Sequence, residues 1–100
     1  MREIDINTRF RKDLKKVRQY PRFDAKLLQQ LLDKLAAGEQ LDAKYRDHKL
    51  VKQSPNGLNT CRNFHLAPNI VVIYKLTPDV VEVLRIGSHS DLGMTECFTN

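Results

Sequence analysis

The chain is short of several residues on which particular classes of protein depend. Its 100 residues include no tryptophan, four glycines, four prolines and two cysteines. So few glycines and prolines exclude collagen-like and low-complexity chains. The two cysteines, Cys61 and Cys97, are too few for a disulfide framework. No apolar run approaches the roughly 18 residues that would indicate a membrane span. We therefore expect an ordinary globular protein with no membrane association.

The N-terminal residues also lack the apolar segment of a secretion signal, since Arg2, Glu3 and Asp5 are charged. We therefore expect a cytoplasmic protein whose cysteines are reduced. One hundred residues suffice for one domain and not for two. We place that domain at residues 1–93 and expect 94–100 to form a C-terminal tail.

Positive charge is concentrated near the N-terminus. The net charge is +5, and one short stretch that includes a single acid, Asp13, holds seven of the basic residues: Arg9, Arg11, Lys12, Lys15, Lys16, Arg18 and Arg22. Such a patch attracts polyanions through Coulomb forces and counterion release. Five of these residues are our candidates for RNA contact: Arg11, Lys12, Lys15, Lys16 and Arg18. A solvated helix face is the alternative interpretation.

The first half of the sequence predicts a short strand followed by two helices. Residues 2–6 alternate polar and apolar, as in a strand, and Asn7 or Thr8 could cap the helix that follows. The first helix would bury a stripe formed by Phe10, Leu14 and Val17. Asp24 could cap a second helix, and Gly38 fits the position just after its end. The strong apolar face of this helix consists of Leu27, Leu28, Leu31, Leu32 and Leu35.

The second half of the sequence predicts three strands, at residues 60–66, 70–74 and 80–86. Their short connections require antiparallel pairing. The predicted order is β-α-α-β-β-β, an α+β fold in which an N-terminal strand and a helical hairpin pack on a twisted antiparallel sheet.

Histidine is the residue type with the clearest chemical potential. The only three, His48, His65 and His89, lie beside polar groups at the predicted ends or edges of elements. Imidazole titrates near neutral pH, so one histidine can accept a proton while another donates one. That chemistry suits metal-independent RNA cleavage by the 2′-hydroxyl, which DNA lacks. Three ordinary surface histidines are the alternative interpretation.

Other chemistries have less support. Arg62 or Arg85 could stabilise charge on a phosphate during RNA cleavage. A zinc site is not expected, because no two histidine or cysteine ligands have the close spacing of zinc signatures. The sequence has no glycine-rich phosphate loop, nucleophile elbow or HExxH motif. We expect neither a metal nor a cofactor.

Four segments together resemble one family, the YafQ-type toxins of the RelE/ParE superfamily. Residues 45–50 (YRDHKL) resemble its Y-x-D-H-x-L motif, and 62–69 (RNFHLAPN) resemble R-x-x-H-h-x-P-D, where h is apolar. Residues 73–76 (IYKL) are similar to the strand that follows, and 85–92 (RIGSHSDL) to the closing R-x-G-[ST]-H-x-x-L. Each motif is short, but the four occur in family order and span most of the chain.

The resemblance implies a RelE-like fold and a ribosome-dependent mRNA endoribonuclease that inhibits translation as the toxin of a type II toxin–antitoxin system. The family's active-site histidines map onto His48, His65 and His89, with His89 as the candidate general acid. The basic first helix would contact RNA in the A site of the small ribosomal subunit. The implied partners are the ribosome, mRNA and a cognate antitoxin, expected as a heterotetramer that contacts operator DNA through the antitoxin.

The chain departs from the family pattern at three places. Asn69 replaces an acidic residue and can hydrogen-bond without acting as a base. Leu92-Gly93 stands where the family has a bulky aromatic residue, and the loop at 52–59 is longer than expected. The alternative is a toxin-fold protein that does not cleave RNA. It would be either a ParE-like gyrase inhibitor or a decayed toxin that only binds antitoxin and DNA.

Overall fold

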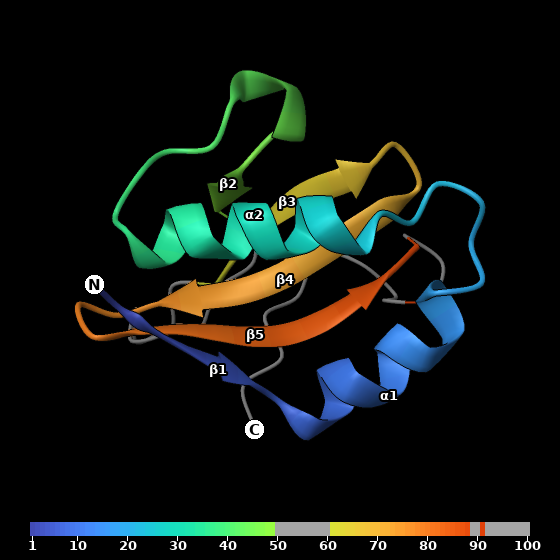
Figure 1. Cartoon of the computed structure of the whole chain (residues 1–100), viewed down its shortest axis with the longest axis horizontal. Coiled ribbons are helices and arrows are strands. Elements are labelled where there is room, and N and C mark those ends of the chain that lie inside the picture. The colour runs from blue at the N-terminus through green and yellow to red at the C-terminus, as the bar shows by residue number, and fades with distance from the viewer. Residues whose placement is uncertain (50–60, 89–90, 92–100) are drawn as a thin grey trace.

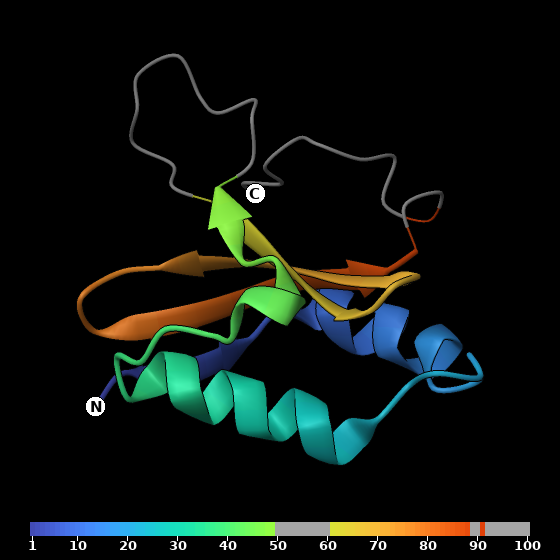
Figure 2. The same cartoon turned by 90° about the horizontal axis from the view of Figure 1, so that it is seen from above.

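The computed structural model describes residues 1–49, 61–88 and 91, and only the backbone of residues 48 and 49. Two helices lie on one side of a five-stranded sheet (Figure 1, Figure 2), which confirms the predicted α+β fold class. The elements in chain order are β1 (Glu3–Ile6), α1 (Thr8–Val17), α2 (Ala25–Ala36), the 3₁₀ helix η1 (Ala43–Tyr45), β2 (His48–Lys49), β3 (Cys61–Ala67), β4 (Ile70–Leu76) and β5 (Val80–Gly87).

Helix α1 begins and packs as the sequence predicts. The side chain of Asn7 caps it, with Oδ1 accepting a hydrogen bond from the backbone N–H of Arg9 at 2.8 Å. Phe10 and Val17 are buried and Leu14 is partly buried, so the apolar stripe faces the protein. The basic residues of the helix are exposed on its opposite side.

Helix α2 also matches its sequence signals. Asp24 Oδ1 accepts a hydrogen bond from the Leu27 backbone N–H at 3.1 Å, which caps the first turn. Leu28, Leu31, Leu32 and Leu35 are buried. Gly38 follows the helix with a φ of 81°, the left-handed conformation that glycine adopts without strain.

The sheet differs from the prediction at its two edges. Strands β3, β4 and β5 pair antiparallel as expected, but the full order is β1-β5-β4-β3-β2. Strand β1 pairs with β5 in parallel, which makes the sheet mixed. This orientation is possible because most of the chain separates the two strands, so no tight turn dictates their direction. The two-residue strand β2 adds a second, unpredicted edge beside β3.

The main core lies between the helices and one face of the sheet, where Phe64, Val72 and Tyr74 pack with α2. Cys61 is fully buried in β3. Cys97 and the predicted tail at 94–100 lie outside the described residues. None of the described helices is long and apolar enough to cross a membrane.

Candidate functional site

Strand register gathers the predicted histidine positions on the sheet face opposite the helices. His48 lies directly opposite Asn63 in the β2–β3 pair, and His65 lies opposite Val71 in the β3–β4 pair. Directly paired residues share a face, and residues two apart in a strand share it too. Because Phe64 between them belongs to the helix-side core, Asn63 and His65 face the other way. We call this sheet face the histidine face; Asn63, Val71 and Ile73 on it are buried, whereas His65 is partly exposed.

The end of β5 lies in register with His65, two strands away. Val71, the partner of His65, pairs on its other side with Gly87 at the end of β5. The predicted site residue His89 follows two positions later in the sequence but lies outside the described residues, as does the side chain of His48. The pairing therefore brings together the backbone of His48, the whole of His65 and the start of the segment that carries His89.

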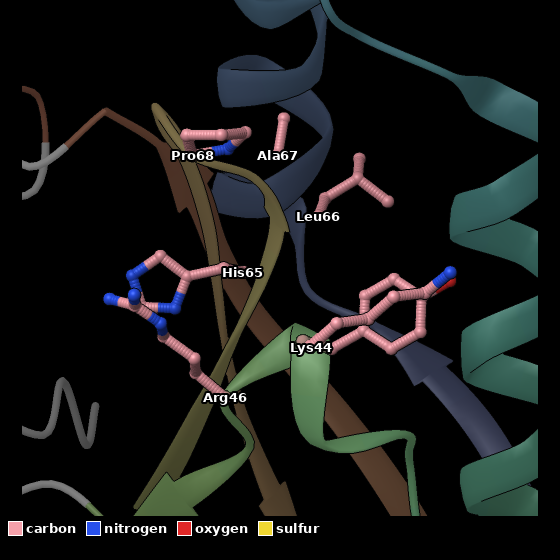
Figure 3. Close-up of a pocket in the computed structure, with 7 residues that line it drawn as sticks. Lys44, Arg46, His65, Leu66, Ala67 and Pro68 are labelled. Carbon is pink, nitrogen blue, oxygen red and sulfur yellow. The ribbon is translucent and has the colours of Figure 1, made fainter.

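A cavity of about 410 Å³ lies beside His65 at the edge of β3. Its wall is formed by η1, the residue after η1, and the end of β3 with the following turn: Lys44, Tyr45, Arg46, His65, Leu66, Ala67 and Pro68. In Figure 3 the side chains of His65 and Arg46 extend to the same side of β3, while Leu66 points to the other side. The ammonium of Lys44 lies 5.2 Å from the centre of the Tyr45 ring, as in a cation–π contact.

Arg46 is a candidate that our sequence analysis missed. It follows η1 with φ 51° and ψ 43°, a left-handed conformation that is uncommon for a residue other than glycine. This conformation turns the chain from η1 into β2. In the sequence the position is an unmarked residue between Tyr45 and Asp47, so only the fold reveals its place beside His65.

Arg62 lies on the helix side of the sheet, away from the histidine face. It pairs directly with Tyr74, a residue of the main core. Its Nε donates hydrogen bonds to Asp47 Oδ1 at 3.2 Å and to the Tyr74 hydroxyl oxygen at 3.3 Å, and the Tyr74 hydroxyl itself donates to Asp47. Burial, followed by this contact with Asp47, raises the pKa of Tyr74 well above its usual value, so the phenol stays protonated.

Arg85 lies near the end of β5 and is fixed by α1. It pairs with Ile73, which in turn pairs with Asn63. Its Nε and Nη2 donate to the two carboxylate oxygens of Asp13 at 2.5 and 3.0 Å, and the hydrogen bond to Asp13 raises the pKa of Arg85. Both side chains are more than four-fifths buried. The guanidinium therefore has a fixed position beside α1.

Asp91 fastens the end of β5 to α1. Its carboxylate accepts hydrogen bonds from Lys16 Nζ at 2.7 Å, from the Ser88 backbone N–H at 3.0 Å and from the Tyr20 hydroxyl. The Asp91 backbone N–H donates back to Ser88 Oγ at 3.0 Å. The bonds from Lys16 and Tyr20 lower the pKa of Asp91 far below its usual range. A Cβ at Gly87 would come within 2.9 Å of the Asp91 Cβ, so this close approach needs glycine.

The basic residues of α1 form a surface separate from the cavity. The five predicted RNA-contacting residues, Arg11, Lys12, Lys15, Lys16 and Arg18, are all exposed. Four of them line one shallow depression of about 470 Å³ with Thr8 and Leu14, while Lys16 is bound to Asp91. Helix α1 lies along β5 (Figure 1), whereas the cavity lies at β3, toward the opposite edge of the sheet. Any ligand that contacts both must extend across the molecule.

Two asparagines, Asn63 and Asn69, lie near His65 in the sequence and differ in exposure. Asn69 is exposed in the turn after Pro68, which lines the cavity. Asn63 is only 4% exposed, and its Oδ1 has no hydrogen-bond partner among the described residues. Within residues 1–49, 61–88 and 91, no cluster of histidine, cysteine or acidic residues could hold a metal ion.

The comparison with known proteins covers nearly the whole chain. Residues 2–94 match the sequence model of a family described as the bacterial toxin of type II toxin–antitoxin system, YafQ. The structure is similar to a chain of the E. coli DinJ–YafQ complex, with 30% identity and a TM-score of 0.77 over 92% of this chain and 98% of that chain. It is also similar to a metal-bound toxin from Helicobacter pylori, with 34% identity and a TM-score of 0.76 over 92% of this chain and 99% of that chain. Nothing among curated proteins matches.

Proposed function

Because the chain belongs to the YafQ family of type II toxins, we propose that it is an mRNA endoribonuclease that acts on the ribosome and inhibits translation. The family membership predicted from the four motifs is confirmed by the match over residues 2–94 and by the structural similarity to E. coli YafQ. The cleavage activity, its dependence on the ribosome and the roles of individual residues are the content of the proposal.

The observation that carries the proposal is the strand register on the histidine face. It sets His48 beside Asn63, His65 two residues further along β3, and Gly87 two strands away from His65. Adjacent strands lie about 4.8 Å apart, so the backbones of His65 and Gly87 are separated by roughly 10 Å. A phosphodiester with its flanking riboses spans a distance of that order, so one RNA backbone could contact groups from β2, β3 and the end of β5.

The proposed reaction is an internal transfer of the phosphoryl group. One histidine accepts the proton of the 2′-hydroxyl while that oxygen bonds to the adjacent phosphorus. The bond from phosphorus to the 5′-oxygen breaks, and a second histidine donates a proton to the leaving oxygen. The products are a 2′,3′-cyclic phosphate and a free 5′-hydroxyl, and no metal ion is needed. We assign proton transfer or phosphate charge to His48 and His65, and the general-acid role to His89.

The two predicted arginines receive different roles. Arg85 lies near the end of β5, and we propose that Asp13 orients it to stabilise negative charge on the phosphate. Arg62 lies on the other side of the sheet and is bound to Asp47 and Tyr74, so its geometry favours an anchoring role. Asn69 would contact the substrate from the turn beside the cavity.

We propose two macromolecular partners. The exposed basic face of α1 would bind ribosomal RNA through its phosphates, with mRNA beside His65. A cognate antitoxin would neutralise the toxin, as the DinJ–YafQ complex suggests. The heterotetrameric stoichiometry, the contact with operator DNA through the antitoxin and the cytoplasmic location remain part of this proposal.

Induction of the protein in cells, followed by primer extension on a reporter mRNA, tests the activity. The wild type should produce discrete cuts within the reading frame, and a block of translation should abolish them. His65→Gln and His89→Ala should reduce cutting by about 100-fold or more, since each removes a group that transfers protons. The control variant Arg22→Gln removes an exposed charge from the turn after α1 and should cut normally.

An expressed and folded wild-type protein that produces no cuts would contradict the proposal. Gyrase inhibition in that protein would then support the ParE-like alternative. Antitoxin and operator binding without either activity would indicate a decayed toxin.

A further inference from the structure

We propose that Arg46 binds a phosphate group of the RNA substrate beside His65. The inference rests on the proposed nuclease function and adds to it a residue that the family motif leaves unspecified. In the segment 45–50 (YRDHKL) the motif marks the residues on either side of Arg46 and is open at Arg46 itself.

The strand register places Arg46 opposite His65. In the β2–β3 pair, Lys49 is opposite Arg62 and His48 is opposite Asn63. Extending that antiparallel register by two residues brings Arg46 level with His65 and onto the same face of the sheet. Both residues line the 410 Å³ cavity, and Figure 3 shows their side chains extending to the same side of β3.

The backbone at Arg46 is in a conformation that arginine seldom adopts. Its φ of 51° lies in the left-handed region, where glycine is tolerated with much less strain. A strained position next to a candidate catalytic residue is a recurrent feature of functional sites. The turn fixes the direction in which the side chain leaves the backbone, and that direction leads toward His65.

The charges around the cavity favour an anion. Among the described residues its lining includes two cations, Arg46 beside His65 and Lys44 on the other side of β3, and no acidic residue. Arg62 is held by Asp47 and Tyr74 on the opposite side of the sheet, and Arg85 is held by Asp13 at β5. Among the described arginines, Arg46 is the one that lines the cavity. A guanidinium can donate two parallel hydrogen bonds to a phosphate, which an ammonium cannot do in the same fixed geometry.

Titration with adenosine 3′-phosphate, followed by the NMR signals of the His65 imidazole, tests this inference in the intact protein. The nucleotide should shift the His65 signals of the wild type. Arg46→Gln should weaken binding at least tenfold, and Arg46→Lys should weaken it less. Arg46→Gly should bind as weakly as Arg46→Gln. Because glycine tolerates the left-handed backbone, this variant distinguishes loss of the guanidinium from disturbance of the turn. The matched control Arg22→Gln, which also loses one exposed positive charge, should bind within twofold of the wild type.

The inference would be overturned if the nucleotide left the His65 signals of the wild type unchanged, or if Arg46→Gln and Arg46→Gly bound it as tightly as Arg22→Gln. These outcomes are independent of cleavage. A protein that binds the nucleotide through Arg46 but cuts no mRNA would retain the inference and refute the proposed nuclease. A protein that cuts mRNA, but whose binding of the nucleotide does not depend on Arg46, would refute the inference and retain the proposed nuclease.

Discussion

Asp47 and Asp91 each accept hydrogen bonds from a tyrosine hydroxyl and from a cation, but the partners of the two carboxylates differ in exposure. Asp47 binds Tyr74 and Arg62, and Tyr74 is fully buried in the core. Asp91 binds Tyr20 and Lys16, and the Lys16 side chain is 67% exposed. The same type of contact thus occurs once beside the buried Tyr74 and once beside the exposed Lys16.

The difference shows what each carboxylate can do for the site. Asp47 directly precedes His48 and ties the start of β2 to β3 and β4, through partners that water and salt reach poorly. Asp91 ties the end of β5 to α1 through a lysine that solvent surrounds. We therefore expect the position of His48 to be fixed by the fold and the β5 end to respond to salt, pH and polyanions bound to α1.

The largest expected effect comes from removing one tyrosine hydroxyl at each carboxylate. Tyr74→Phe removes a buried donor to Asp47 and should lower the free energy of unfolding by about 2 kcal/mol. Tyr20→Phe makes the same chemical change at Asp91 and should cost less than half as much, because water can replace the lost donor. Urea unfolding of the two variants measures both values. Equal losses, or a larger loss for Tyr20→Phe, would remove the distinction between the two carboxylates.

A smaller effect is expected from the ionisation of Asp91. Its pKa is lowered in the folded protein, so its contribution to stability is present above the unfolded value of about 4 and is lost as the pH falls through the folded value. At pH 7 Asp91→Asn should lower the melting temperature by a few degrees, and roughly 1 M salt should reduce that difference because Lys16 is exposed. The difference from the wild type should shrink as the pH falls below 4. A difference that is the same at pH 7 and pH 2.5 would show that the charge of Asp91 contributes nothing.

Local signals explain why the sequence predicted the helices and the central strands. The caps Asn7 and Asp24, the leucine face of α2 and Gly38 act over a few residues and can be identified one segment at a time. The continuous apolar run of β4 belongs to a strand buried on both faces. The same kind of local signal led to the prediction that the candidate histidines lie at the ends or edges of elements.

Features that depend on distant partners could not be predicted in this way. Asp13 is 72 residues from Arg85, and Asp47 is 15 residues from Arg62, so nothing local shows that these arginines are bound to carboxylates. Strand β2 has only two residues and no apolar pattern. The left-handed backbone of Arg46 occurs in a residue type that gives no turn signal. These are the features that distinguish the roles of the arginines.

The most direct test of the central claim is cleavage of an mRNA that carries a single 2′-deoxynucleotide at the cut position. Purified protein, ribosomes and this mRNA would be compared with the same mRNA containing only ribonucleotides. We expect the all-ribose mRNA to be cut to a 2′,3′-cyclic phosphate and the substituted mRNA to stay intact at that position, since its nucleophile is missing. Cleavage of the substituted mRNA at the same position would contradict the internal-attack mechanism and the histidine roles proposed for it.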